Sequence, residues 1–326
     1  MLQYLVILLD DTSTSYCHYT NSKKEWHLIS VENLKAGIVF GMKENLMIQF
    51  VYPNYEIPKE YKDVIESIDH SNIMPIVSKD ADVIVFNEWR EMLNCSFDKK
   101  KTYVLRICKS DIFSQHSLIK TILGKVARLN VVITDIETFT EADFNTYKTC
   151  LQEWSKELEH LYASGDTPQF NLLTDRMVLD NMNNCGAGDT TITLAPDGCF
   201  YICPAFYYDE TCDGTEKSLG DVCSKGYSIG SLKEGLNIKN PQLYKFTHAP
   251  LCRICDAYHC KRCVWLNRRT TFEVNTPSHE QCVVAHLERN ASRDLLSAIK
   301  KYGKFLPEKE IKEISYLDPF DVREKW

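Results

Sequence analysis

The residues of this chain most suited to chemistry are its cysteines. There are 14 of them in 326 residues, and ten lie between Cys185 and Cys282. Residues 1–11 have no basic leader and no small-residue cleavage site, so we expect a cytoplasmic protein. Cysteines in the cytoplasm seldom form structural disulfides, and crowded cysteines there indicate metal or redox chemistry. The second half of the chain is therefore the predicted functional region.

The densest cysteine segment contains two CxxC pairs four residues apart. It reads Cys252-Arg-Ile-Cys255-Asp-Ala-Tyr-His-Cys260-Lys-Arg-Cys263, and Cys282 follows nineteen positions later. A CxxC turn directs both sulfurs toward one centre, and thiolate sulfur binds zinc and iron strongly. Two hypotheses stay open: a tetrahedral zinc site within this segment that includes His259, and an iron–sulfur site with ligands from separated segments. The spacing argues against inert, buried thiols.

A predicted hairpin lies among the earlier cysteines. Leu194-Ala-Pro-Asp-Gly198 places a Pro-Asp-Gly turn between apolar residues, which is typical of a β-hairpin. Such a hairpin would bring Cys185 back toward Cys203 across two short strands, and Cys199 lies between them in the sequence. Cysteines from separated segments are therefore expected to meet here.

The first half of the chain alternates apolar strands with amphipathic helices. The pattern predicts strands at 2–9, 46–52, 73–77, 82–86, 102–107, 130–136 and 170–173, and helices at 31–43, 59–69, 113–127 and from Thr140 to about 164. Such alternation is typical of βα units around a mostly parallel sheet. We predict an α/β fold with an open or partial (β/α) barrel, and a doubly wound sheet is the alternative. In both, ligands bind where strands end, here after residues 9, 52, 87, 107 and 136.

Composition excludes two classes of partner. The chain has 38 basic and 45 acidic residues, a net charge of −7, and no long basic run. Nucleic-acid binding needs clustered Lys and Arg, so it is not expected. No apolar run approaches the roughly 18 residues that a membrane span requires.

The cysteine spacing resembles the SPASM domain of radical SAM peptide maturases. A cysteine, twelve residues, a glycine, four residues and a cysteine precede the CxxC block, which is one residue shorter in two intervals than is usual in that family. The resemblance implies two auxiliary [4Fe–4S] clusters with interleaved ligands. The first would take Cys185, Cys203 and Cys263, with Cys199 or an open position as the fourth. The second would take Cys252, Cys255, Cys260 and Cys282.

The resemblance also implies a radical SAM partial barrel in the first half, but the loop after the first strand departs from the family. Radical SAM enzymes hold their catalytic cluster there with CxxxCxxC, whereas this loop offers Cys17 alone, and Asp10 and Thr14 occupy the other two positions. One thiolate cannot hold a [4Fe–4S] cluster. Either a second protein of the system supplies the radical chemistry or the chain is a pseudoenzyme, and binding of S-adenosylmethionine stays open. Cys17 is interpreted as a structural thiol, because an adjacent His18 seldom faces it as a base.

Three longer stretches are similar to the CXXX repeat peptide maturases. They are Leu8–Tyr19, Leu34–Ile38 and Glu44–Pro53. Such proteins are assigned to systems that modify small peptides with cysteine at every fourth residue. The resemblance implies maturation of a small cysteine-rich ribosomal peptide, with clusters that bind the peptide or relay electrons. The alternative is a zinc-stabilised peptide-binding module without catalysis.

These interpretations divide the chain into three parts. Residues 1–180 would form the radical SAM-like partial barrel, 181–290 a small cysteine-rich SPASM-like domain, and 291–326 a C-terminal helix and charged tail. The tail from Lys304 on is expected to lie on the surface, docked by Phe305, Tyr316 and Phe320.

Overall fold

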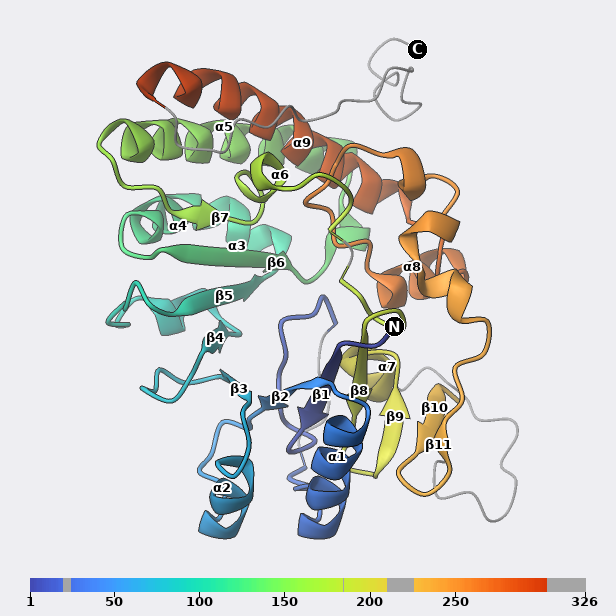
Figure 1. The fold of residues 1–326 in the computed structure, drawn as a ribbon. Helices are drawn as coiled ribbons and strands as arrows, with labels where there is room; N and C mark the ends of the chain where they lie inside the picture. The colour runs from blue at the N-terminus through green and yellow to red at the C-terminus, as the bar shows by residue number, and fades with distance from the viewer. Residues whose placement is uncertain (20–24, 184, 210–225, 304–326) are drawn as a thin grey trace. The chain divides into compact units, whose positions relative to one another are not determined.

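A computed structural model of the chain describes residues 1–19, 25–183, 185–209 and 226–303 (Figure 1). These residues form two compact units. The first unit is Met1–Val85 with Gly186–Lys245, and the second is Phe86–Cys185 with the chain from Phe246 on. The predicted division at residues 180 and 290 stays a prediction, and the predicted tail from Lys304 on lies outside the described residues.

The first unit is built on a sheet that is parallel in its centre. The strand order is β11-β10-β9-β8-β1-β2-β3-β4, and the pairs from β8 to β4 are parallel while those from β8 to β11 are antiparallel. The strands are β1 (Tyr4–Leu8), β2 (Met47–Val51), β3 (Ser71–Met74), β4 (Val83–Phe86), β8 (Thr191–Leu194), β9 (Cys199–Tyr201), β10 (Ser228–Ser231) and β11 (Gly235–Leu236).

The order of these strands favours the barrel-type arrangement over a doubly wound sheet. Strands β1 to β4 follow one another in sequence order, whereas a doubly wound sheet reverses its order at a switch point. β1 pairs with β2 on one side and with β8 on the other, and its residues from Leu5 to Leu8 are buried. Its apolar sequence is explained by this central position. The β8–β9 hairpin confirms the turn predicted from Leu194 to Gly198.

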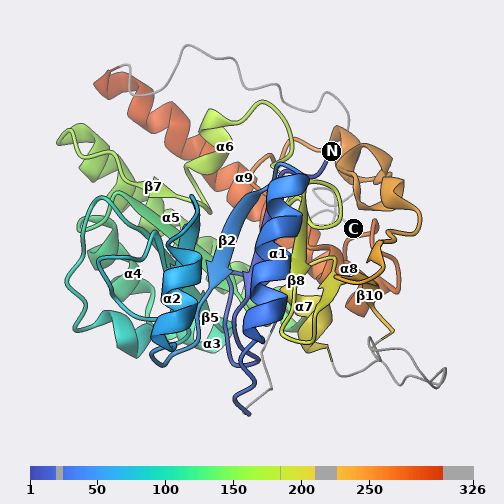
Figure 2. The same cartoon turned by 60° about the horizontal axis from the view of Figure 1, so that its bottom comes forward.

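Helix α1 (Val31–Lys43) covers one face of the parallel strands (Figure 2). The Ser30 hydroxyl accepts a hydrogen bond of 3.1 Å from the backbone N–H of Asn33, so the helix begins where its N-cap residue predicts. The helix lies close to β8, because a Cβ added to Gly37 would lie 2.3 Å from the Leu194 side chain. The remaining helices of this unit are α2 (Lys59–Ile65), α7 (Pro204–Tyr208) and the 3-10 helix Pro241–Tyr244.

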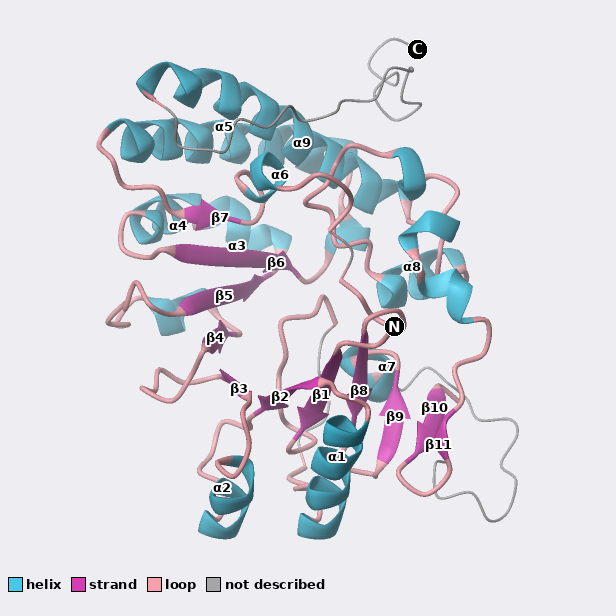
Figure 3. Ribbon diagram, in the orientation of Figure 1, coloured by secondary structure: helices cyan, strands magenta, loops and turns pink. Residues whose placement is uncertain are grey.

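The second unit combines three parallel strands with two long helices. The strands are β5 (Thr102–Ile107), β6 (Arg128–Ile133) and β7 (Gln169–Phe170), in that order. Helices α5 (Glu141–Ala163) and α9 (His279–Ile299) lie side by side (Figures 1 and 3). The shorter helices are α3 (Lys109–Ser114), α4 (His116–Leu123), α6 (Asp175–Val178), α8 (Val264–Thr271) and the 3-10 helices Trp89–Met92, Ile136–Thr138, Phe246–His248, Cys252–Ile254 and Lys300–Tyr302.

Two predicted elements of this unit differ from the structure. The single helix predicted at 113–127 is two helices, because Gln115 between them has a non-helical backbone with φ −111° and ψ 17°. The strand predicted at 170–173 ends at Phe170, where the Thr174 hydroxyl accepts a hydrogen bond of 2.7 Å from the Phe170 N–H and turns the chain. Of the helices in the described ranges, none is long and apolar enough to cross a membrane.

Candidate metal centre

Four of the cysteines line one cavity in the second unit. The cavity has a volume of about 150 Å³, and the four are those that the resemblance assigns to the second cluster: Cys252, Cys255, Cys260 and Cys282. Within the described residues, none of the four belongs to a disulfide. The structure therefore brings together the predicted ligands of this cluster, although Cys282 lies far from the others in the sequence.

Local hydrogen bonds hold each of these cysteines in place. Cys252 lies in the 3-10 helix Cys252–Ile254, and the Cys255 N–H closes the CxxC turn by donating to the Cys252 carbonyl at 3.1 Å. Cys282 lies in the first turn of α9, and its N–H donates to the carbonyl of the N-cap residue Ser278 at 3.2 Å. The positive end of a helix stabilises a thiolate, so this location suits a metal-binding sulfur.

Burial favours the protonated form of two of these thiols, so a metal must displace their protons. Cys252, Cys255 and Cys260 pack together with the apolar side chains of Met182 and Phe246. Burial raises the pKa of the Cys252 and Cys260 thiols, and at Cys252 the charge of Arg262 offsets part of this effect. A metal that binds here releases the protons, so its affinity increases with pH.

The donor set of the cavity suits both metal centres expected from the sequence. Thiolates hold zinc at about 2.3 Å in tetrahedral sites. They also hold the irons of a [4Fe–4S] cluster, one thiolate to each iron. The four cysteines that line the cavity therefore fit a cluster, and they fit zinc as well.

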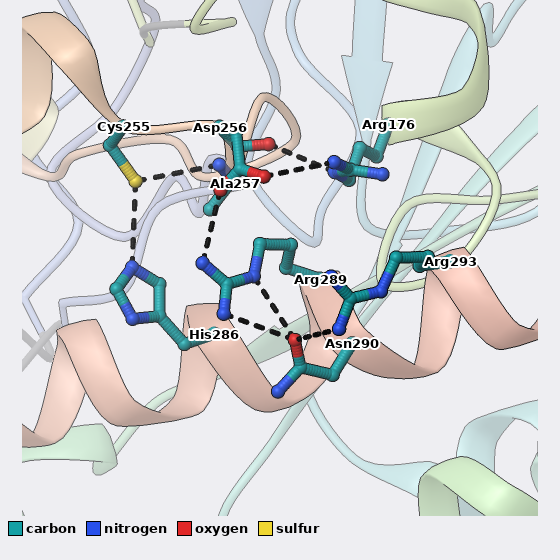
Figure 4. A network of polar contacts seen from close by, with 8 residues as sticks. All are labelled: Arg176, Cys255, Asp256, Ala257, His286, Arg289, Asn290 and Arg293. Atoms are coloured by element: carbon teal, nitrogen blue, oxygen red, sulfur yellow. Dashed lines mark hydrogen bonds and ion pairs between the residues drawn. The ribbon is translucent and has the colours of Figure 1, made fainter. Parts of the chain in front are cut away.

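A buried ion-pair network fixes the loop that carries Cys255 (Figure 4). The Asp256 carboxylate accepts from the guanidinium groups of Arg176 and Arg289, each at 3.1 Å, and all three side chains are almost fully buried. The Arg176 Nε–H also donates to the Asp256 carbonyl at 2.9 Å. Beside it, the Ala257 N–H donates to the Cys255 sulfur at 3.4 Å, and His286 Nε2 lies 3.5 Å from that sulfur.

His259, the candidate zinc ligand, is engaged elsewhere. Its Nε2 lies 3.0 Å from Glu288 of α9, whose other oxygen accepts from the Tyr147 hydroxyl of α5 at 2.6 Å. The sequence analysis missed this network and the ion pairs of Asp256. The partners are 29 to 141 residues apart and follow no local spacing, so no signal in one sequence would have revealed them.

The cysteines assigned to the first cluster are divided between the units. In the second unit, Cys185 is exposed, and Cys263 is the buried N-cap of α8 whose sulfur accepts from the Leu266 N–H at 3.5 Å. In the first unit, Cys203 is the buried N-cap of α7 and Cys199 lies in β9 in a disulfide-bonded state. The grouping of these residues around one cluster stays a prediction.

In the first unit, the loop after β1 is held by its own hydrogen bonds. Asp10 is fully buried; one carboxylate oxygen accepts from the N–H and hydroxyl of Thr12 at 2.8 and 2.5 Å, and the other accepts from Tyr55 at 2.8 Å. Tyr55 follows β2, so the loops after the first two strands contact each other. Cys17 is half-buried, 3.8 Å from the Ser15 hydroxyl.

Tyrosines of helix α7 complete the packing of this loop. Tyr207 donates to the Asp11 carboxylate, and Tyr208 donates to the Ser13 carbonyl at 2.8 Å while its ring stacks on Tyr19. Burial raises the pKa of both α7 tyrosines, so their hydroxyl groups stay protonated donors. The place that holds the CxxxCxxC cluster in radical SAM enzymes is here built from aspartate, hydroxyl and tyrosine groups.

Comparison with known proteins supports this fold. No family model and no curated protein matches the chain. Among solved structures, it is similar to anSMEcpe, an anaerobic sulfatase-maturating radical SAM enzyme, with bound AdoMet; the TM-score is 0.59 at 12% identity, over 92% of this chain and 100% of that chain. The chain has a radical SAM-type fold. The structure of native anSMEcpe with bound AdoMet and the Cp18Cys peptide has a TM-score of 0.56 at 11% identity. This match covers 92% of this chain and 100% of that chain.

Proposed function

We propose that this chain is a SPASM-type iron–sulfur protein that takes part in the maturation of a small cysteine-rich ribosomal peptide. The observation that carries the proposal is the cavity of the second unit, where Cys252, Cys255, Cys260 and Cys282 surround one space. The radical SAM-type fold supports it, because the similar enzyme anSMEcpe was solved with AdoMet and with a peptide.

Each proposed cluster has its own set of cysteines. The four cavity cysteines hold one [4Fe–4S] cluster. Cys185, Cys203 and Cys263 hold the other. Its fourth position stays open while Cys199 is disulfide-bonded, and reduction of that disulfide frees Cys199 as the fourth ligand. When bound, such clusters supply one-electron transfer and an iron able to accept a ligand. An open position suits a peptide thiolate, which would explain a preference for cysteine-rich peptides.

The loop after β1 limits what the chain does alone. Both oxygens of the buried Asp10 carboxylate accept hydrogen bonds, from Thr12 and from Tyr55, and oxygen ligands match a sulfur-bound iron cluster poorly. The radical chemistry therefore comes from a second protein of the maturation system, or the chain serves as a degenerate subunit that binds the peptide.

Metal analysis of anaerobically purified protein tests the proposal. We expect iron and acid-labile sulfide, about eight irons per chain for two cubanes, and a broad brown absorbance. A Cys252→Ser/Cys255→Ser variant, which removes two ligands of one cluster, should keep about half of this iron. Zinc alone, with no iron after reconstitution, would establish the zinc-stabilised binding module instead.

Peptide binding is tested on the same protein. A small peptide with cysteine at every fourth position should bind and alter the visible spectrum, and the same peptide with serine in place of cysteine should not. Equal binding of the two peptides contradicts a thiolate-directed site.

A further inference from the structure

Three polar side chains that belong to no predicted ligand set line the cysteine cavity: Arg262, Gln281 and His286. His286 lies beside the Cys255 sulfur, as described above. Arg262 and Gln281 are 0% and 5% exposed and share the cavity wall with the four thiols. The rest of the lining is largely apolar, with Met182, Pro250 and Ala285 among its members. A polar group in such a wall acts at short range on whatever occupies the cavity, since little water screens it.

Arg262 interacts with two of the cavity cysteines. It lies between Cys260 and Cys263 and has a left-handed backbone with φ +43°, which a residue with a side chain seldom adopts. In this conformation its backbone N–H hydrogen-bonds the Cys260 sulfur, and its guanidinium charge acts on Cys252. A non-glycine residue keeps such a conformation only where its surroundings hold it there.

Gln281 supplies an independent observation. Its side-chain Oε1 is buried and has no hydrogen-bond partner among the described residues. A buried amide oxygen without a partner is unfavourable, and the amide oxygen and nitrogen are interchangeable by a flip of the side chain. After the flip, the NH₂ group takes the place of this oxygen and is available as a donor. Gln281 directly precedes Cys282 in the first turn of α9, where its own N–H is bound by the Ser278 hydroxyl at 3.2 Å.

We propose that Arg262 and Gln281 set the reduction potential of the cluster held by Cys252, Cys255, Cys260 and Cys282. This inference rests on the proposed iron–sulfur function. Reduction adds one negative charge to a group that is already anionic through its four thiolates. A buried cation and an amide donor stabilise that added charge, so they raise the potential; hydrogen bonds and charge around the sulfurs are established determinants of cluster potentials.

The test is an anaerobic redox titration followed by electron paramagnetic resonance. The signal to follow is the one that the Cys255→Ser variant loses. Arg262→Met should lower the midpoint potential by at least about 59 mV, which corresponds to a tenfold change in the equilibrium constant of a one-electron reduction. Arg262→Lys should recover most of this shift. Gln281→Met should lower the potential less, and Gln281→Glu more than Gln281→Met because it adds a negative charge.

The controls separate this role from a structural one. Arg253→Met removes an exposed arginine of the same segment that does not line the cavity, and should leave the potential unchanged. Iron content and visible absorbance are measured for every variant. Unchanged midpoint potentials in variants that keep their full iron content overturn the inference and leave the iron–sulfur proposal intact. Loss of iron from all four variants of Arg262 and Gln281 has the same consequence, because the two residues would then be structural. A wild-type protein with zinc and no iron overturns both.

Discussion

At the scale of single residues, burial and proton release govern the chemistry of the thiols. Cys252 and Cys260 need a metal to displace their protons, because burial favours their neutral form. Cys150 of α5 lies outside the proposed ligand sets, and burial raises its pKa to about 11. Burial therefore favours the neutral form of all three thiols, and the two that line the cavity are the ones that a metal can deprotonate.

Cys150 gives a prediction for the stability of the metal-free protein. Its folded pKa of about 11 lies above the usual value of about 9, so its neutral form contributes stability that is complete below pH 9 and is lost as pH rises through 11. The expected loss from this one group by pH 11 is about 2 kcal/mol. Urea unfolding at pH 8 and pH 11 measures it. Cys150→Ala should show a smaller decrease between the two pH values than the wild type, and equal decreases would contradict the prediction.

The cavity cysteines and Cys17 should differ in their effect on metal content. Cys255→Ser removes a ligand of the proposed second cluster and should lose that cluster's iron and destabilise the second unit, because metal binding and folding are coupled. Cys17→Ser is the matched control: it makes the same chemical change in the loop after β1 and should leave the iron content unchanged. The measurement that checks this difference is the iron content per chain of both variants. If Cys17→Ser loses as much iron as Cys255→Ser, the N-terminal loop holds a cluster.

At the scale of elements, the sequence predicts well what depends on neighbouring residues. The bounds of α1 and β5 and the Thr140–Asp143 capping box of α5 agree with the structure, because caps and apolar periodicity are local. The turn that joins Cys252 and Cys255 is local for the same reason. The arrival of Cys282 at that turn depends on how α9 packs against α5, and this packing cannot be read from spacing. Arg262 and Gln281 escaped sequence analysis because only the folded cavity shows that they face the thiols.

Helix α9 should affect metal retention through its N-cap. Ser278→Ala removes the hydroxyl that accepts from the Gln281 N–H and loosens the turn that carries Cys282, at a cost of about 1 kcal/mol. Ser30→Ala removes the equivalent cap of α1 in the first unit and should cost about the same. Both should lower the urea midpoint, but Ser278→Ala alone should accelerate iron loss to a chelator. Equal rates for the two variants would show that the first turn of α9 does not hold the metal.

At the scale of the whole molecule, the chain combines a radical SAM-type fold with a changed cluster loop. The similarity to anSMEcpe extends over 92% of the chain, although the chain lacks the CxxxCxxC motif. In the first unit, hydrogen bonds hold the loop after β1, and they join Asp10 to Tyr55 and Asp11 to Tyr207. The fold therefore does not depend on the motif, and the function proposed for the chain rests mainly on the cysteines of its second unit.

The isolated protein should not cleave S-adenosylmethionine. A cluster that binds this cofactor needs three protein thiolates and one open iron, and the loop offers Cys17 alone, while both oxygens of Asp10 are occupied by internal donors. The reconstituted and reduced protein, incubated with S-adenosylmethionine, should form no 5′-deoxyadenosine above a control without enzyme, as measured by chromatography with mass detection. Formation of 5′-deoxyadenosine in proportion to the protein concentration would contradict this prediction, provided that the Cys17→Ser variant forms none. The variant shows whether the activity belongs to the loop of this chain. The two interpretations of the loop differ in one further outcome: a chain that depends on a second protein for the radical chemistry should form product once that protein is added, and a pseudoenzyme should not.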